Sequence, residues 1–588
     1  MDKTTGKDRT KKPKQPGISS LLKPYRGMIF LLVLLALLSN GINLLIPRII
    51  SQGIDAYTNH QFDMGHIVRI FALAAGSIFI FSYLQSIVQT YASERVARDL
   101  RTRLSDKISR QSHAFVQNSN PSKLLTNLTS DIDSIKMFVS QAIVSISSSL
   151  IIIIGVAILL LSINWRLGLI VLLIVPAIGG TFFYTLRKAK PFFTQGREVI
   201  DWLNKVINES ILGSALIRLI NSQQLEYNKF IDANTKALGL GVSIVRLFAT
   251  LIPVIIFTAS LASLSILVLG GHFVIAGNMS LGNFAAFNSY LTMLIFPILI
   301  IGFMSNVIAQ STASWARVNQ ILMAPDTIDS GTIKEALKGE IELKDVSVAY
   351  GEKMALKNIS FRLQAGSRTA VIGPTAAGKS QLLYLLTALI KPSTGSILYD
   401  GRDIDDYQKD SFHQQIGFVF QDSIIFNLSI RENIAFSDTV TNESLQLAIE
   451  TAELSDFIES LPDKLNTIVS ERGSSLSGGQ KQRIMLARAL AVNPRVLLLD
   501  DFTARVDANT EKKILDNVEK NYPGLTLLSV TQKIAAIEEY DQIMVLMEGE
   551  MIASGKHALL METSPEYVQI YNSQQSTSHY ETVAAEMS

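Results

Sequence analysis

The chain has 588 residues, too many for one hydrophobic core, and by length alone we expect about four domain-sized units. A mean hydropathy of +0.28 with 18% charged residues is too apolar for a wholly soluble protein. The net charge of +2 does not indicate nucleic acid as a partner, and the absence of cysteine excludes disulfides, cysteine metal sites and thiol catalysis.

Residues 1–26 form a basic segment in which eight Lys or Arg residues face only Asp2 and Asp8. Such a run is typical of nucleic acid binding or of a solvated tail, and we favour the tail. The apolar segment that follows is long and shows no small-residue cleavage site. We therefore interpret residues 1–26 as a cytoplasmic anchor for a first membrane span rather than as a removable signal peptide.

Six apolar stretches are long enough to cross a bilayer, and they lie near residues 28–47, 68–90, 142–163, 167–186, 248–270 and 282–304. We expect a transmembrane domain over residues 27–321 and a linker over residues 322–340. Arg and Lys gather in the long connections after the second and fourth stretches, whereas residues 51–66 contain none. The positive-inside rule therefore places these two long loops, the N-terminus and everything after the sixth span in the cytoplasm. Buried helices of a large soluble core are the alternative.

The apolar interiors of the six stretches contain no Asp, Glu or Lys, so the sequence gives no support to ion-coupled transport. Aromatic side chains within the stretches could line a path for a bulky apolar molecule, although helix packing and lipid contact are common roles for them. These residues are Phe79, Phe81, Phe182, Phe183, Tyr184, Phe284, Phe287, Tyr290 and Phe303.

Short apolar strands alternate with helical stretches over residues 341–571, which predicts an α/β domain with a largely parallel sheet, followed by a tail over residues 572–588. The predicted core strands are Thr369–Ile372, Gly417–Phe420, Val496–Leu499, Thr526–Val530 and Gln542–Met547.

A glycine-marked turn lies between the first of these strands and an apolar helical run over Leu382–Ile390. Strand, turn and helix in this order are typical of a phosphate-binding loop, where backbone N–H groups and the helix N-terminus face nucleotide phosphates. An ordinary glycine turn is the structural alternative. We expect Lys379 to add a positive charge and Ser380 to ligate Mg²⁺. The predicted binding residues are Gly373, Pro374, Thr375, Ala376, Ala377, Gly378, Lys379 and Ser380.

Two further motifs follow the loop. Asp500 ends a buried strand and can hold Mg²⁺ beside Ser380. The residues Leu476, Ser477, Gly478, Gly479 and Gln480 precede a helical run over Lys481–Ala491, so they offer a serine and glycine amides at a helix N-terminus, a second anion site. The pentapeptide alone is a weak signal, but the three motifs in this order are very specific.

With these motifs the sequence resembles the ABC transporter superfamily over almost the whole chain. Tyr350 stands where that family stacks an aromatic ring on the base, and Gln421 follows a strand as the family's metal-ligating glutamine does. Residues Glu471–Gly473 fit the family pattern just before the signature Leu476–Gln480.

The membrane half resembles six-span exporters in which one chain fuses a membrane domain to a nucleotide-binding domain. Phe115 and Asp131 fit their first cytoplasmic loop, and Glu209 and Phe230 fit the second. The resemblance implies a six-helix α-helical transmembrane domain followed by an α/β P-loop ATPase domain that uses ATP and Mg²⁺. Short helices near Pro121 and Ala215 would touch nucleotide-binding domains. Two such chains would dimerise and bind two nucleotides head to tail, each between the phosphate loop of one chain and the signature of the other.

Departures from the family pattern lie at the catalytic positions. Asp501 replaces the usual glutamate that positions the attacking water, and the shorter side chain withdraws its carboxylate by roughly 1.5 Å, which is enough to cost on the order of a hundredfold in rate. Gln532 replaces the usual histidine and cannot carry its positive charge. Milder changes are Ala376 for a loop glycine and residues 504–507, Ala-Arg-Val-Asp, for Ser-Ala-Leu-Asp.

We expect a site that binds nucleotide through intact metal ligands, Ser380, Gln421 and Asp500, but hydrolyses it poorly because of Asp501 and Gln532. The alternative is that Asp501 remains an adequate base. Because the signature is intact, we expect a heterodimer whose partner half-transporter supplies the usual catalytic residues.

The expected function is ATP-driven export of amphipathic, drug-like compounds across a bacterial inner or plasma membrane. A nucleotide-gated channel, a regulatory subunit and a lipid or peptide exporter are the alternatives, and Tyr350 does not distinguish ATP from GTP.

Overall fold

The computed structural model describes residues 17–326, 331–470 and 473–574, and it divides into two compact units. A helical unit comprises Met1–Arg110 and Ser119–Pro325, and an α/β unit comprises Gln111–Asn118 and Asp326–Ser588. The boundary between Pro325 and Asp326 falls inside the expected linker. Most of the basic N-terminal segment, Glu471 and Arg472, and most of the expected C-terminal tail lie outside the described residues.

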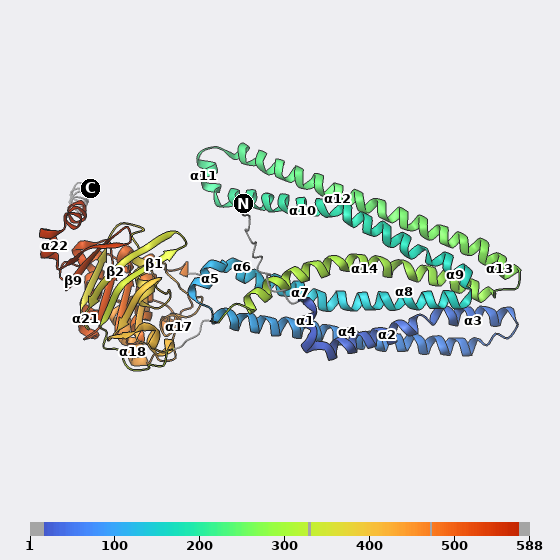
Figure 1. Ribbon diagram of the computed structural model, residues 1–588, viewed down its shortest axis with the longest axis horizontal. Helices are drawn as coiled ribbons and strands as arrows, with labels where there is room; N and C mark the ends of the chain where they lie inside the picture. Colours follow the sequence, from blue (N-terminus) through green and yellow to red (C-terminus); the bar gives the residue numbers. More distant parts are fainter. Residues whose placement is uncertain (1–16, 327–330, 471–472, 575–588) are drawn as a thin grey trace, which may run out of the picture. The chain divides into compact units, whose positions relative to one another are not determined.

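Six helices of the helical unit are long and apolar enough to cross a membrane, which confirms the six predicted spans. They occupy Ser20–Thr58, Met64–Ser109, Pro121–Ile163, Trp165–Leu212, Gln223–Ile275 and Leu281–Leu322. Their main segments are α2 (Arg26–Asn43), α3 (Ile46–Thr58), α4 (Met64–Ser109), α8 (Ile143–Ile163), α9 (Trp165–Leu172), α10 (Ile174–Leu212), α12 (Gln223–Ser265) and α14 (Leu281–Leu322) (Figure 1).

The two connections expected as long loops are largely helical. Helix α4 continues to Ser109, and α10 and α12 approach each other through the short α11 (Ser214–Leu219). Hydropathy marked the ends of the apolar stretches and not the ends of the helices, because a charged stretch ends an apolar run without ending a helix. Residues 91–109 are rich in Arg, Ala and Leu, all good helix formers. Short helices at α6 (Pro121–Thr126) and α11 fit the two positions, near Pro121 and Ala215, where short helices were expected.

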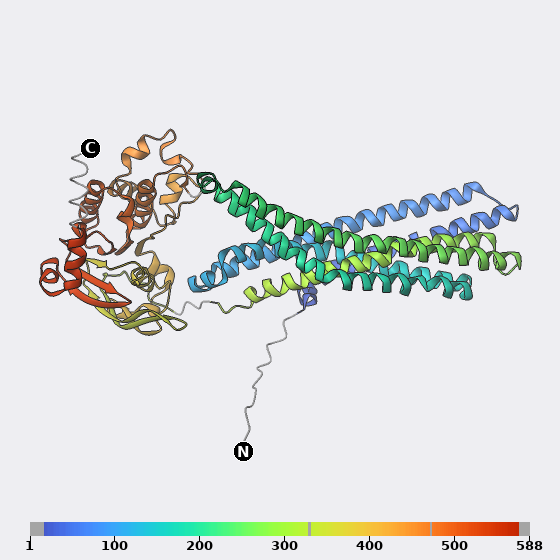
Figure 2. The same ribbon diagram turned by 90° about the horizontal axis from the view of Figure 1, so that it is seen from above.

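Helices α10 and α12 run as an antiparallel pair along their length (Figures 1 and 2). Helix α14 packs against α8 and α3, and α2 packs against α4. In the core of the unit, the ring of Tyr290 is fully buried and its hydroxyl donates to the carbonyl of Leu44 at 3.0 Å. Phe287 and Tyr290, two of the aromatic residues considered for a transport path, therefore serve helix packing.

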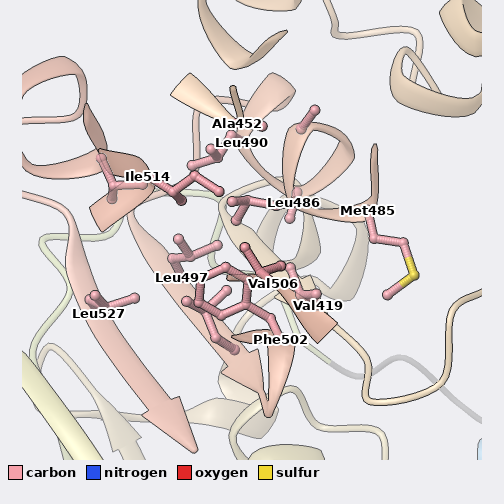
Figure 3. Close-up of a cluster of buried hydrophobic side chains, with 14 of the residues drawn as sticks. Val419, Ala452, Met485, Leu486, Leu490, Leu497, Phe502, Val506, Ile514 and Leu527 are labelled. Atoms are coloured by element: carbon pink, nitrogen blue, oxygen red, sulfur yellow. The ribbon is translucent and has the colours of Figure 1, made fainter. Parts of the chain in front are cut away.

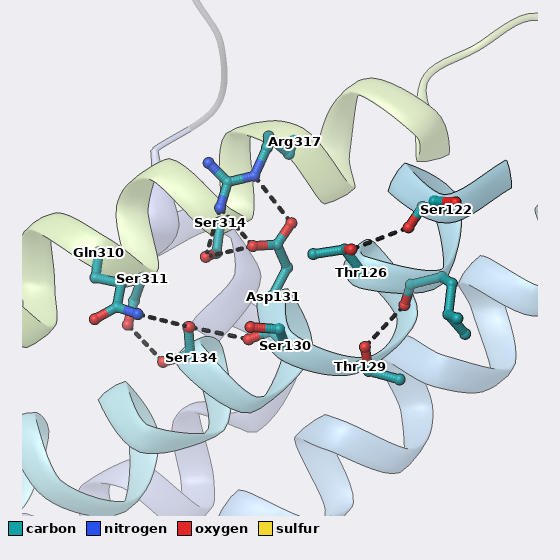
Figure 4. A network of polar contacts seen from close by, with 11 residues as sticks. Ser122, Thr126, Thr129, Ser130, Asp131, Ser134, Gln310, Ser311, Ser314 and Arg317 are labelled. Carbon is teal, nitrogen blue, oxygen red and sulfur yellow. Dashed lines mark hydrogen bonds and ion pairs between the residues drawn. The ribbon is translucent and has the colours of Figure 1, made fainter. Parts of the chain in front are cut away.

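A buried polar cluster joins the C-terminal half of α14 to the segment around Asp131 (Figure 4). Asp131 is 3% exposed and accepts hydrogen bonds from Arg317 Nε at 2.9 Å and from the Ser314 hydroxyl at 2.8 Å. One turn along α14, the Ser311 hydroxyl donates to the carbonyl of Ser134. Because an unpaired carboxylate would be costly at this depth, Arg317 and Ser314 hold the two segments in one register.

The α/β unit is built on a six-stranded sheet in the order β10-β9-β3-β8-β7-β6. Its strands pair in parallel except at β10, which pairs antiparallel with β9. The predicted largely parallel sheet is confirmed, and each of the five predicted core strands begins and ends within one residue of a strand of this sheet. The strands are β3 (Arg368–Ile372), β6 (Ile416–Val419), β7 (Val496–Asp500), β8 (Thr526–Val530), β9 (Gln542–Met547) and β10 (Glu550–Gly555).

A second, four-stranded antiparallel sheet in the order β2-β1-β4-β5 was not foreseen. It consists of β1 (Ile341–Tyr350), β2 (Lys353–Leu363), β4 (Thr394–Tyr399) and β5 (Arg402–Asp403). Apolar and polar residues alternate at the start of β1, where Ile341 and Leu343 are buried. That alternation is typical of a strand with one solvated face, and this strand could have been predicted from it.

Both faces of the parallel sheet are covered. Leu497 and Leu499 of β7 belong to one hydrophobic cluster, and the intervening Leu498 belongs to another. The first cluster also holds Leu486 of α20 (Gly478–Ala491) and Ile514 of α21 (Ala508–Asn521) (Figure 3). This packing fixes α20, whose first turn lies within the Leu476–Gln480 segment.

The remaining described helices of the α/β unit are short. They are α5 (His113–Ser119, its last residue in the helical unit), α15 (Lys379–Leu386), α16 (Lys409–His413), α17 (Ile430–Ile434), α18 (Asn442–Thr451), α19 (Ser455–Glu459) and α22 (His557–Thr563).

Candidate functional site

The predicted phosphate loop connects β3 to α15 as expected from the sequence. Gly373 and Gly378 have φ values of 151° and 101°, in the region that favours glycine. A side chain at Gly373 would also meet the carbonyl oxygen of Leu546 at 2.0 Å. Ala376 has φ of 65°, so its Cβ is held in a left-handed conformation at a cost of about 1 kcal/mol. The loop thus keeps its shape although alanine has replaced a glycine there.

Lys379 begins α15, and its side chain turns back into the loop. Its Nζ donates to the carbonyls of Gly373 at 2.7 Å and Pro374 at 2.8 Å. Burial lowers the pKa of this ammonium, while the nearby Asp501 and Asp500 act in the opposite direction. A buried cation whose partners are two carbonyls is well placed to attract phosphate oxygens.

Asp500 is the last residue of β7 and is 2% exposed. Burial raises the pKa of its carboxyl above the ordinary aspartate value, and a hydrogen bond with Ser380 offsets part of that shift. Its Oδ2 atom is buried and has no hydrogen-bond partner among the described residues. A buried carboxylate oxygen without a partner, next to a hydroxyl, fits the oxygen ligands that Mg²⁺ prefers.

Asp501, directly after Asp500, has φ of 49°, in the left-handed region. Its N–H donates to the carbonyl of Val530 at 2.9 Å, which ties the end of β7 to the end of β8. Burial raises the pKa of its carboxyl, and the positive charges of Lys379 and Lys533 lower it. Gln532 lies beyond the end of β8, and its carbonyl accepts a hydrogen bond from Gln574.

A cavity of about 600 Å³ brings most of the predicted residues together. Gly373 and Pro374 instead contribute the carbonyls that hold Lys379. At one side of the cavity, the Tyr350 hydroxyl donates to Gln381 Oε1 at 2.7 Å, and its ring is half exposed. The predicted residues that line the cavity are Tyr350, Thr375, Ala376, Ala377, Gly378, Lys379, Ser380, Gln421, Asp500, Asp501 and Gln532.

The five residues Leu476–Gln480 are all described, and none of them lines this cavity. Ser477 is the N-cap of α20, and its hydroxyl oxygen accepts from the N–H of Gln480 at 3.2 Å. The side chain of Gln480 accepts from the N–H of Ser477 at 2.8 Å, which completes a capping box. The segment therefore presents an ordered helix N-terminus away from the phosphate-loop cavity.

The sequence analysis did not foresee that Arg505 packs against the start of α20. A side chain at Gly478 would meet Arg505 Cδ at 2.8 Å, and one at Gly479 would meet the Arg505 carbonyl oxygen at 2.9 Å. Arg505 also donates its N–H to Gln482 at 3.3 Å. The short helix Phe502–Arg505 after Asp501 is thus held against the signature helix. The adjacent Gly478 and Gly479 leave room for a close backbone approach, and this contact could have been suspected from them.

Lys533 is a second residue whose role was not foreseen. Its Nζ donates to the carbonyl of Thr503 at 3.0 Å and to Glu511 Oε2 at 2.9 Å. Glu511 is 4% exposed, so its carboxylate depends on this partner. Lys533, which directly follows Gln532, thus ties the end of β8 to the short helix that follows Asp501. Only its place directly after Gln532 in the chain pointed toward it.

Two family descriptions match the chain in the order of the two units. Residues 29–298 match the ABC transporter transmembrane region, and residues 356–504 match the ABC transporter family. The uncharacterized ABC transporter ATP-binding protein YfiB of Bacillus subtilis is 30% identical over 568 residues, which cover 94% of this chain and 98% of that protein. The chain belongs to the ABC transporter family.

Other relatives of this ABC transporter have more specific names. An ATP-dependent lipid A-core flippase of Syntrophus aciditrophicus is 30% identical over 86% of this chain and 84% of that protein. A multidrug resistance ABC transporter ATP-binding and permease protein of Lactococcus lactis is 28% identical over 93% of this chain and 94% of that protein.

Among solved structures, a bacterial Atm1-family ABC exporter with ATP bound matches the fold. Its TM-score is 0.79 at 24% identity, over 93% of this chain and 98% of the other. The family and the two units make the chain an ABC transporter in which a transmembrane unit is fused to an ATPase unit.

Proposed function

We propose that the chain is the degenerate-site half of a heterodimeric exporter that moves amphipathic, drug-like compounds out of the cell. Its own phosphate loop binds ATP with Mg²⁺ through Lys379, Ser380, Gln421 and Asp500, and hydrolyses it weakly. The signature Leu476–Gln480 completes the partner subunit's site, where most turnover occurs. The N-terminus and the α/β unit are cytoplasmic, as the distribution of Lys and Arg indicates.

One observation carries the proposal. Asp501 and Gln532 line the same cavity as the intact Lys379, Ser380 and Asp500. The groups that hold a nucleotide therefore coexist with two replacements at the positions that act on the attacking water and on the γ-phosphate. Because a carboxylate displaced by about 1 Å loses on the order of a hundredfold in rate, retention of nucleotide is favoured over its hydrolysis.

Exposed apolar side chains at the tip of the α10–α12 pair support a contact with the partner subunit. Leu212 is 78% exposed and Leu219 of α11 is 83% exposed. Ile211, Leu216 and Ile220 beside them are also exposed. Clustered apolar side chains outside the apolar part of the spans mark a surface that another protein covers.

The substrate class rests on the relatives and on the membrane spans. A lipid A-core flippase and a multidrug resistance transporter are both named among the relatives, and amphipathic compounds are a class that can include both a lipid and drugs. No acidic residue lies in the apolar interior of any span, which argues against an ion-coupled pathway. ATP is therefore the energy source in this proposal, and GTP is the alternative nucleotide.

Purification of the chain with and without its partner subunit, followed by an ATPase assay, tests the proposal. We expect the isolated chain to bind ATP and to hydrolyse it far more slowly than the complex. Robust hydrolysis by the isolated chain would contradict the heterodimer. In sealed vesicles, ATP-dependent accumulation of a fluorescent drug against its gradient is expected, whereas a nucleotide-gated channel would only equilibrate it.

A further inference from the structure

A large cavity lies within the helical unit, between α10, α12 and α14. Its volume is about 1000 Å³, which is in the upper range of small-molecule sites. The lining residues begin at the end of the predicted apolar stretch of α10 and at the start of that of α12, and on α14 they span the last residues of its stretch and the residues just beyond it. The cavity therefore lies at one boundary of the hydrocarbon region.

Most of the cavity wall is apolar. Phe193, Phe248 and Phe303 line it together with Ile255 and Leu299. The ring of Phe303 packs edge to face on Phe182, with centroids 5.1 Å apart. A side chain at Gly302 would meet Phe182 Cε1 at 2.1 Å, so glycine at this position lets the aromatic pair form this part of the wall. Such a surface accommodates an acyl chain or another apolar body.

Two cations, Lys190 and Arg197, interrupt this wall. They are seven residues apart on α10, so they lie on the same helix face about 10 Å apart along the axis. Neither forms an ion pair with any described residue. Both residues are exposed, so an anionic group that enters the cavity can reach them, and charge-assisted hydrogen bonds to a carboxylate or phosphate are roughly twice as strong as neutral ones.

The cavity has no acidic lining residue that could neutralise them. From α12 it is lined by Phe248, Leu251, Ile252 and Ile255, and from α14 the polar lining residues are Ser305 and Asn306. Glu198 follows Arg197 on α10 but does not line the cavity. The wall thus combines a wide apolar surface with a net positive charge at one end.

We propose that this cavity binds amphiphiles with an anionic head group, specifically long-chain lipids whose carboxylate or phosphate lies between Lys190 and Arg197. The chain then packs along Phe248, Phe303 and Ile255. This inference rests on the proposed export function and narrows its substrate class from amphipathic compounds in general to anionic ones.

The test measures binding without ATP to the full complex of the chain and its partner subunit in discs of neutral phosphatidylcholine. The probes are a dansyl-labelled long-chain fatty acid, its methyl ester and the matching trimethylammonium compound. Because hydrogen bonds to charged groups are strong, we expect the acid to bind about tenfold tighter than the ester. The double variant Lys190→Gln, Arg197→Gln should remove that preference, and Lys190→Glu with Arg197→Glu should transfer it to the cationic probe.

Lys188→Gln is the matched control, because Lys188 is an exposed cation of the same helix that does not line the cavity. It should keep the wild-type preference. Equal affinity for the three probes, or an anion preference that survives the double variant, would overturn the inference. Loss of the partner subunit from the purified double variant would also overturn it, because the two cations would then belong to the subunit interface. Failure of the export function itself would show separately, as absence of ATP-driven transport for every probe.

Discussion

The phosphate loop and the signature both place backbone amides at the first turn of a helix, α15 in one case and α20 in the other. At α15 the N-cap is Gly378 in a left-handed conformation, without a side-chain cap. At α20 the N-cap is Ser477, with a complete capping box. The phosphate loop depends on residues at the ends of β7 and β8 for its chemistry, whereas the signature carries its polar groups within its own five residues.

This difference matters for the positions at which the sequence departs from the pattern of the family. Asp501 and Gln532 follow β7 and β8, and both line the cavity of this chain's own loop. In the sequence interpretation, Leu476–Gln480 matches the signature pattern of the resembled family in full. A chain whose own site had lost turnover, but whose signature still served a partner, would show this distribution. Four variants test the comparison, in order of expected effect.

The largest effect is expected from Ser477→Ala. It removes a hydroxyl that would donate to the partner-bound nucleotide, and loss of one such donor commonly costs about a hundredfold or more in turnover. Thr441→Ala is the matched control, because Thr441 caps α18 through the same kind of capping box. Both variants should lose about 1 kcal/mol of stability, but only Ser477→Ala should silence the ATPase activity of the complex. Equal activity of the two variants would contradict the role of the signature.

Lys379→Met should have the next largest effect, on nucleotide binding rather than on turnover. Removal of the cation held by Gly373 and Pro374 should weaken photolabelling of this chain by azido-ATP about tenfold or more. The labelling of the partner subunit should change much less. Lys391→Met, which removes an exposed cation paired with Asp405, is the control. Undiminished labelling of this chain would place its nucleotide elsewhere.

A gain of function is expected from Asp501→Glu combined with Gln532→His. Introduced into the Ser477→Ala chain, the pair should restore part of the lost ATPase activity, because it rebuilds the catalytic groups at this chain's own loop. A gain of about tenfold over the Ser477→Ala background is expected, less than a well-placed general base can provide. No gain would mean that another feature, such as the strained Ala376, limits this site.

The smallest effect is expected from Asp501→Asn in the otherwise unchanged complex. Its ATPase activity should fall by no more than about twofold, whereas removal of a working general base costs about a hundredfold or more. Steady-state hydrolysis by the purified complex is the measurement. A loss as large as that of Ser477→Ala would show that Asp501 is an adequate base. The nucleotide site of this chain and that of the partner subunit would then be equally active.

The sequence was informative where turn residues and apolar runs border a motif. The glycines of the phosphate loop and the buried strand before Asp500 predicted β3, α15 and β7 well, because apolar runs and turn residues act locally. The residues that were predicted to bind one nucleotide mostly line one cavity. Their individual roles stay predictions.

Contacts between distant parts of the chain could not be read from local patterns. The buried Asp131 forms an ion pair with the more exposed Arg317 across 186 residues, and no local pattern near either residue indicates the other. The same holds for Lys533 with Glu511 and for Arg505 against Gly478. The long helical extensions were missed for a different reason, because hydropathy reports burial in lipid and not the continuity of a helix.

The capping box at Ser477 also decides the direction of a proton. Its hydroxyl oxygen already accepts from the N–H of Gln480, so one lone pair points back into the helix. The hydroxyl hydrogen is then free to rotate outward. An anion approaching α20 therefore meets a hydroxyl whose oxygen is already held in place and whose hydrogen can turn toward it, so little side-chain entropy remains to be lost when the anion binds.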